Sequence, residues 1–144
     1  MLLQEEYEEL LKYKKKFEED DYLHLGPHPI KWSRNIISLE SHDIFIMDYT
    51  RGSIEVKKYS VNKRIKTSII MIRYCSQGNH TNPDGITKFS GPHLHLYKEG
   101  FDDKIAVDPS DIGISTTDTI EETIRKILKY ANVQDIPVIQ SDLL

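Results

Sequence analysis

The chain has 144 residues, of which 38% are hydrophobic and 29% charged, and we expect one domain over residues 1–144 that folds on its own. Its apolar runs are shorter than the roughly 18 to 20 residues that cross a bilayer, and its first residues lack the basic and apolar parts of a secretory signal. A single cysteine, Cys75, excludes an internal disulfide, so we expect a cytoplasmic protein with no membrane partner.

The net charge of −4 conceals an uneven distribution of charged residues. Residues 1–21 contain eight acidic and four basic residues, whereas residues 51–88 contain eight basic and two acidic residues, a local charge of +6. A basic segment attracts a polyanion such as RNA, or it forms ion pairs with acidic segments of the same chain. The charge pattern alone leaves both interpretations open.

The first predicted element is an N-terminal helix over about residues 2–20. Its apolar residues recur on one stripe at a spacing near 3.6, namely Leu3, Tyr7, Leu10, Leu11 and Phe17. The segment Gly26-Pro27-His28-Pro29 then prevents any helix from continuing, because proline lacks the backbone donor and restricts the residue before it.

Extended segments rich in β-branched and aromatic residues follow, at 36–40, 43–49, 53–59 and 65–74. Arg51-Gly52 and residues 61–64 occupy the positions of hairpin connections, so consecutive strands should pair antiparallel. A fifth strand is expected at His93–Tyr97, with a short extension at 104–107. The predicted sheet therefore covers about residues 31–107.

A C-terminal helix is predicted over about residues 119–131, where Ile120, Ile124, Ile127, Leu128 and Ala131 share one face. Asp118 and Glu121 resemble a capping box at its start, and Asn132 and Pro137 supply a stop. The elements together predict an α+β fold, in which two amphipathic helices pack on one face of a curved antiparallel sheet of about five strands.

The segment Gly91-Pro92-His93-Leu94-His95-Leu96-Tyr97 carries the candidate working surface. Side chains alternate along a strand, so His93, His95 and Tyr97 should share one face while the leucines enter the core. The preceding connection, residues 76–91, is long, and its turn signal Asn82-Pro83-Asp84-Gly85 should fold it back. Such a fold would bring His80 to the two histidines, with Arg73 nearby.

Two chemistries fit such a cluster. A metal-independent, ribonuclease-like site would lie on the face that holds His80, His93, His95, Tyr97 and Arg73. There His93 or His95 would be the general base or acid and the other would orient the phosphate, while Arg73 and Lys98 bind charge and Tyr97 positions a proton or base. The expected ligand-binding residues are Lys98, Lys66 and Asn82. A zinc site would instead need a third ligand from His80, Glu99, Asp102 or Asp103. We predict no cofactor and no metal, and we assign Cys75 to packing at a strand end.

Residues 91–106, with the loop Gly78-Asn79-His80-Thr81-Asn82-Pro83, resemble a family of small uncharacterised proteins of Firmicutes and their phages or mobile elements. That family carries a Gly-Pro-His-x-His-x-Tyr-x-Glu-Gly segment. The resemblance implies a phage or mobile-element setting and brings no established activity. A weaker similarity, to toxin components of toxin–antitoxin pairs, favours the ribonuclease-like interpretation by analogy.

The leading hypothesis is therefore a small intracellular protein of a phage or mobile element that acts on RNA or another phosphate-bearing ligand through the His-x-His strand face. The alternative is a non-enzymatic, anti-CRISPR-like inhibitor that binds a host defence complex through its acidic helices or its sheet face. Whether the protein is an enzyme stays open at this point.

Overall fold

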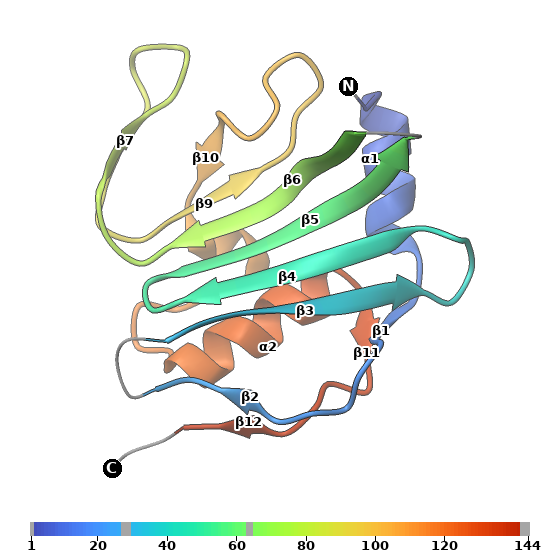
Figure 1. Ribbon diagram of the computed structural model, residues 1–144. Helices are drawn as coiled ribbons and strands as arrows, with labels where there is room; N and C mark the ends of the chain where they lie inside the picture. Colours follow the sequence, from blue (N-terminus) through green and yellow to red (C-terminus); the bar gives the residue numbers. More distant parts are fainter. Residues whose placement is uncertain (1, 27–29, 63–64, 142–144) are drawn as a thin grey trace.

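The computed structural model describes residues 2–26, 30–62 and 65–141, and their side chains except those of residues 60–62 and 65–67. Over these residues the chain forms the helices α1 (Gln4–Lys12) and α2 (Ile120–Tyr130), the short 3-10 helix η1 (Pro109–Ile112) and a large, mostly antiparallel sheet (Figure 1). In this described part neither α-helix is long and apolar enough to cross a membrane. The predicted α+β class is confirmed.

The main sheet has eight strands among the described residues. Their spatial order is β10 (Ala106–Val107), β9 (His93–Leu96), β6 (Ile65–Cys75), β5 (Ser53–Asn62), β4 (Ile44–Thr50), β3 (Lys31–Ser38), β1 (Lys15–Phe17) and β11 (Val133–Gln134). The strands β1 and β11 pair parallel, and the other neighbours pair antiparallel. The expectation of about five strands is wrong, because strands of two or three residues are too short to show alternation in a sequence.

Two smaller pairs of strands flank this sheet. The strands β2 (Leu23–His24) and β12 (Ile139–Gln140) pair parallel near the C-terminus. The strands β7 (Asn79–Thr81) and β8 (Lys88–Ser90) form a hairpin that extends beside β9 and β10 (Figure 1). The hairpin confirms that the long connection 76–91 folds back on itself.

The predicted N-terminal helix over residues 2–20 is wrong beyond Lys12. Lys15 falls within the predicted helix but is buried in β1, and its ammonium group donates hydrogen bonds to the carbonyl oxygens of Leu11, Tyr13 and Ala131. Carbonyls at a helix end lack partners within the helix. The lysine therefore satisfies the end of α1 and also the C-cap residue of α2, and the chain continues as a strand.

The central strands and the second helix agree more closely with expectation. The turn at Arg51-Gly52 joins β4 to β5, and Gly52 adopts φ 95°, which favours glycine. The expected second hairpin falls at 63–64, outside the described residues. The predicted helix 119–131 is confirmed as Ile120–Tyr130, but its capping box is formed by Thr119 and Glu122 instead of Asp118 and Glu121.

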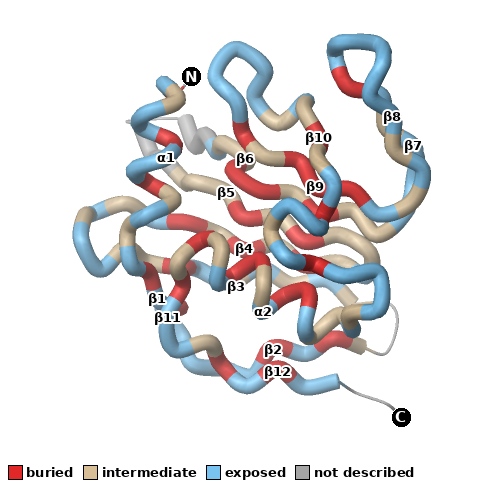
Figure 2. The backbone as a smooth tube through the Cα atoms, turned by 180° about the vertical axis from the view of Figure 1, so that it is seen from behind, coloured by how far each residue is buried: buried red, intermediate tan, exposed pale blue. Residues whose placement is uncertain are grey.

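The two faces of the sheet differ in polarity. One face carries the buried core and is covered by α2, which lies behind the sheet in Figure 1 and in front of it in Figure 2. The register places Tyr49, Ile54, Tyr74 and Leu94 in one row on this face, each opposite the next across neighbouring strands. Residues one position along each strand point to the opposite face, which carries mainly polar side chains.

Candidate functional site at the histidine cluster

A row of polar side chains crosses five strands on the open face of the sheet and ends at His95. Cross-strand register places its members opposite one another in the order Ser33, Asp48, Glu55, Arg73 and His95. Lys57 pairs with both acids of the row, with its Nζ 2.8 Å from Asp48 and 3.3 Å from Glu55. One ammonium group is therefore shared by the two carboxylates in the middle of the row.

A second row runs beside the first and ends at His93. Its members are Lys31, Thr50, Ser53, Cys75 and His93, again opposite one another across the same strands. The edge of the sheet thus brings together two histidines from β9 and two residues from β6, Arg73 and Cys75.

His93 and His95 are buried, with 4% and 2% of their surface exposed. The Nδ1 atom of His93 lies 2.9 Å from the Gly91 carbonyl oxygen, and that of His95 lies 2.8 Å from the Asp103 carbonyl oxygen. Carbonyl oxygens only accept hydrogen bonds, so each Nδ1 carries a proton, and in the neutral ring Nε2 keeps a lone pair. Burial, followed by the charge of Arg73, lowers the pKa of His95 to about 4.

His80 reaches the cluster from the β7–β8 hairpin, as predicted. The centre of its ring lies 4.5 Å from that of His95 and 5.7 Å from that of His93. Its Nε2 donates to the side-chain oxygen of Asn82, at 2.9 Å, and to the Lys104 carbonyl oxygen, at 3.0 Å. Nδ1 is then the nitrogen of His80 that keeps a lone pair.

Asn82 fixes the hairpin against the edge of the main sheet. Its amide group donates to the carbonyl oxygen of Ala106 at 2.9 Å and accepts from the backbone N–H of the same residue at 2.8 Å. This double hydrogen bond joins the hairpin turn to β10. Asn82, expected to bind a ligand, therefore positions His80 in this structure.

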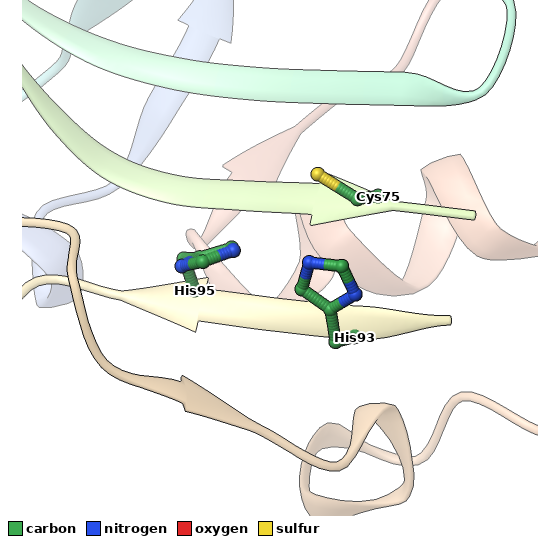
Figure 3. Close-up of side chains that lie close together, drawn as sticks. All are labelled: Cys75, His93 and His95. Carbon is green, nitrogen blue, oxygen red and sulfur yellow. The ribbon is translucent and has the colours of Figure 1, made fainter. Parts of the chain in front are cut away.

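Cys75 lies directly opposite His93 across β6 and β9. One ligand atom from each of Cys75, His93 and His95 can be chosen so that all three lie within 4.8 Å of one another (Figure 3). Sequence reasoning assigned Cys75 to packing, because 18 positions separate it from His93 in the chain. Only the pairing register of β6 with β9 reveals their contact. Burial raises the pKa of the Cys75 thiol.

Arg73 is the cationic group of the cluster. Its guanidinium lies 3.2 Å from the Asp103 carboxylate, while its Nε is buried and has no hydrogen-bond partner in the described part of the chain. About a third of the side chain, 31%, is exposed. Arg73 therefore lies partly in contact with solvent, beside the buried histidines.

Tyr97 lies apart from the cluster. The strand β9 ends at Leu96, and the Tyr97 hydroxyl donates to the Leu2 carbonyl oxygen and accepts from the Leu2 backbone N–H. Its ring packs against Tyr7 of α1 at 5.2 Å between centroids. The expected shared face with His93 and His95 does not extend to Tyr97, because the chain leaves the strand before it.

The other expected site residues occupy different surroundings. Lys98 is exposed in the turn after β9, and the side chain of Lys66 lies outside the described ones. Among the expected third metal ligands, Glu99 accepts a hydrogen bond from the Gln4 backbone at 2.7 Å, Asp102 lies in the same turn as Lys98, and Asp103 pairs with Arg73.

Three basic residues of segment 51–88 form ion pairs with acidic residues in the described part of the chain. Lys57 pairs with Asp48 and Glu55, Lys58 with Asp43, and Arg73 with Asp103. None of these acids belongs to residues 1–21. For these three cations, partners within or beside the sheet explain the charge pattern, and the acidic N-terminal segment does not.

Comparisons with known proteins identify a family and no function. No curated protein and no solved structure gives a significant match to this chain. A model of a family of unknown function, DUF6978, matches residues 2–133, which is most of the chain. The expected resemblance to an uncharacterised family is thereby confirmed in its general form. The protein belongs to the family DUF6978.

Proposed function

We propose that the protein acts on RNA, or on a smaller phosphate-bearing ligand, at the histidine cluster. The proposal rests on Arg73. Its Nε is buried and has no hydrogen-bond partner among the described residues, and it lies where the three imidazole rings come together. A guanidinium binds phosphate through pairs of parallel N–H donors. An anionic oxygen at Arg73 would satisfy this donor next to His95.

The imidazoles supply the chemistry in this proposal. His93 and His95 each present an Nε2 lone pair while carbonyl oxygens hold the opposite nitrogen. Fixed rings with available lone pairs serve to accept a proton or to bind an electrophile, and they need no reorganisation during a reaction. His80, half-buried on the hairpin, would contact a ligand bound at Arg73. Tyr97 has no role in this version of the site.

The setting proposed is the cytoplasm of a bacterial cell that carries a phage or mobile element. The Gly-Pro-His-x-His-x-Tyr-x-Glu-Gly segment at residues 91–100 supports the phage or mobile-element part. Cys75, unpaired and half-buried, supports a reducing compartment.

Replacement of Arg73 by Gln tests the proposal. Titration of fluorescein-labelled single-stranded RNA, followed by fluorescence anisotropy, should show at least tenfold weaker binding for Arg73→Gln than for the wild type. Arg125→Gln is the matched control, because Arg125 forms an exposed pair with Glu121 on α2. Equal affinity in the two variants, or no RNA binding by the wild type, contradicts the RNA proposal. A parallel titration with a nucleoside monophosphate separates a small ligand from the polymer.

A non-enzymatic inhibitor of a host defence complex is the second candidate, favoured by the exposed face of α1. Four acidic residues of this helix, Glu5, Glu6, Glu8 and Glu9, are exposed. An acidic interface should tolerate the double change His93→Ala and His95→Ala. A variant that folds and still protects a phage from the host defence would favour this candidate over the histidine cluster.

A further inference from the structure

We infer that Cys75, His93 and His95 form a binding site for a divalent transition metal, with Zn²⁺ as the best fit. A set of one sulfur and two nitrogen donors suits zinc, whereas magnesium and calcium prefer oxygen donors. The inference of a metal site does not depend on the proposed function. Only the role given to the metal below rests on that function.

The three donors already converge. Their ligand atoms lie within 4.8 Å of one another, and Figure 3 shows the Cys75 sulfur and a nitrogen of His93 turned toward the same space, with His95 beside them. Tetrahedral zinc, with bonds of about 2.0 to 2.3 Å, holds its ligands roughly 3.3 to 3.8 Å apart. A shift of the ligand atoms by about 1 Å would bring them to these separations.

The outer contacts of the histidines match those of metal ligands. A histidine that binds a metal through one nitrogen usually donates its other ring N–H to a carbonyl or carboxylate oxygen. His93 does so to Gly91, and His95 does so to Asp103. These bonds fix both rings with Nε2 as the nitrogen available for a metal. Two exposed histidines on a strand would not need such bonds to carbonyl oxygens. Their presence at both His93 and His95 therefore favours a metal site.

His80 closes the cluster and is not required as a ligand. Its ring stacks on His93 with 12° between the ring planes and meets His95 edge-on. Its Nε2 proton is already bound by Asn82 and Lys104. Zinc sites with three protein ligands keep a fourth position for water or substrate, and this pattern is typical of catalytic sites. We assign the fourth position here to such a group, beneath His80.

The charge of the loaded site fits an anionic ligand. Cys75 binds zinc as a thiolate, so its proton leaves to solvent when the metal binds. One thiolate neutralises half of the metal charge, and the Asp103 carboxylate neutralises Arg73. The remaining positive charge attracts a phosphate oxygen to the fourth position. If the proposed function holds, zinc binds or activates the group that meets the phosphate.

Zinc binding to the purified full chain tests the inference. Metal-free protein dialysed against Zn²⁺ should retain one zinc per chain, and Cys75→Ser and His93→Ala should each weaken the affinity at least about 100-fold. His42→Ala is the control, because His42 is exposed at a turn far along the chain from the cluster. Circular dichroism establishes whether each variant folds. If His93→Ala unfolds, Cys75→Ser still tests the site, because it changes only one atom.

Two further readouts identify the ligands. Cobalt(II) in place of zinc should give a sulfur-to-cobalt charge-transfer band in the near ultraviolet for the wild type and His42→Ala, and no such band for Cys75→Ser. Zinc should also slow alkylation of Cys75, the single cysteine of the chain. Less than about one tenth of a zinc per chain, or equal zinc affinity in Cys75→Ser and wild type, overturns the inference.

The outcomes separate the metal site from the proposed function. Stoichiometric zinc with no affinity for RNA or nucleotide rejects the function and keeps the site. Full RNA affinity in a chelator, with no zinc bound after dialysis, rejects the site and keeps the function.

Discussion

Two buried polar sites of this protein differ in how many hydrogen bonds they complete. Lys15, 1% exposed, donates to three carbonyl oxygens at 2.7 to 3.1 Å, which uses all three protons of its ammonium group. His93 and His95 each use one ring nitrogen and keep a lone pair on the other. A buried group with all its bonds made serves the fold, whereas unused bonding capacity in a buried residue requires an explanation such as a bound ion or ligand.

Removal of Lys15 should have the largest effect on stability. Lys15→Met should lower the free energy of unfolding by about 3 kcal/mol, because the buried carbonyl of Ala131 and the partly buried carbonyls of Leu11 and Tyr13 lose their donor. Urea denaturation measures this change, and the melting temperature should fall by roughly 10 °C. Lys16→Met, at the exposed neighbouring position of β1, should change stability by less than about 0.5 kcal/mol. Equal effects of the two changes would show that the three bonds do not stabilise the fold.

Asn82 provides the next largest effect. Asn82→Ala should cost about 2 kcal/mol, because the backbone groups of Ala106 lose two hydrogen bonds and His80 loses one. Hydrogen exchange should accelerate in the β7–β8 hairpin and leave α2 protected. Asn79→Ala, exposed in β7, serves as the control. Unchanged exchange in the hairpin would mean that Asn82 does not hold it in place.

The pH dependence of stability tests the surroundings of Lys15. Burial lowers the pKa of Lys15 from 10.5 to about 8, so between these values the unfolded chain binds more protons than the folded one. The free energy of unfolding should therefore rise with pH, by about 1.5 kcal/mol between pH 7 and 9.5. The raised pKa of buried Tyr7 acts in the opposite direction above about pH 10. Chemical denaturation across this range should give a rising curve for the wild type and a curve without this rise for Lys15→Met, and a falling wild-type curve contradicts the assignment.

The smallest effect is expected at Cys75 in metal-free protein. Cys75→Ser should change the free energy of unfolding by less than about 1 kcal/mol, because the thiol is only half-buried. Zinc at 100 times its dissociation constant should stabilise the wild type by about 2.7 kcal/mol and Cys75→Ser by less than about 0.5 kcal/mol. Thermal denaturation with and without zinc measures both quantities. A large loss without zinc would place Cys75 with Lys15, among groups that serve the fold.

The sequence predicted the central strands, the C-terminal helix and the approach of His80. The alternation of His93 and His95 with Leu94 is visible in the chain itself, and the turn at Asn82–Gly85 identifies the hairpin that returns His80 to them. These features depend on neighbours within a few positions. Local pattern is therefore sufficient for them.

The remaining features depend on contacts between distant parts of the chain. Cys75 joins the cluster through the register of β6 with β9, and Lys15 meets Ala131 across 116 positions. The strand β11 has two residues and exists because it pairs with β1. No periodicity marks such elements, so the sequence alone extended the N-terminal helix through Lys15 and assigned Cys75 to packing.

X-ray absorption at the zinc edge determines whether the histidine cluster binds a metal ligand. Wild-type protein loaded with one equivalent of zinc should give one sulfur neighbour at about 2.3 Å and nitrogen neighbours at about 2.0 to 2.1 Å. That result places the metal between Cys75 and the two histidines. A shell of oxygen and nitrogen alone would place zinc elsewhere and contradict the account.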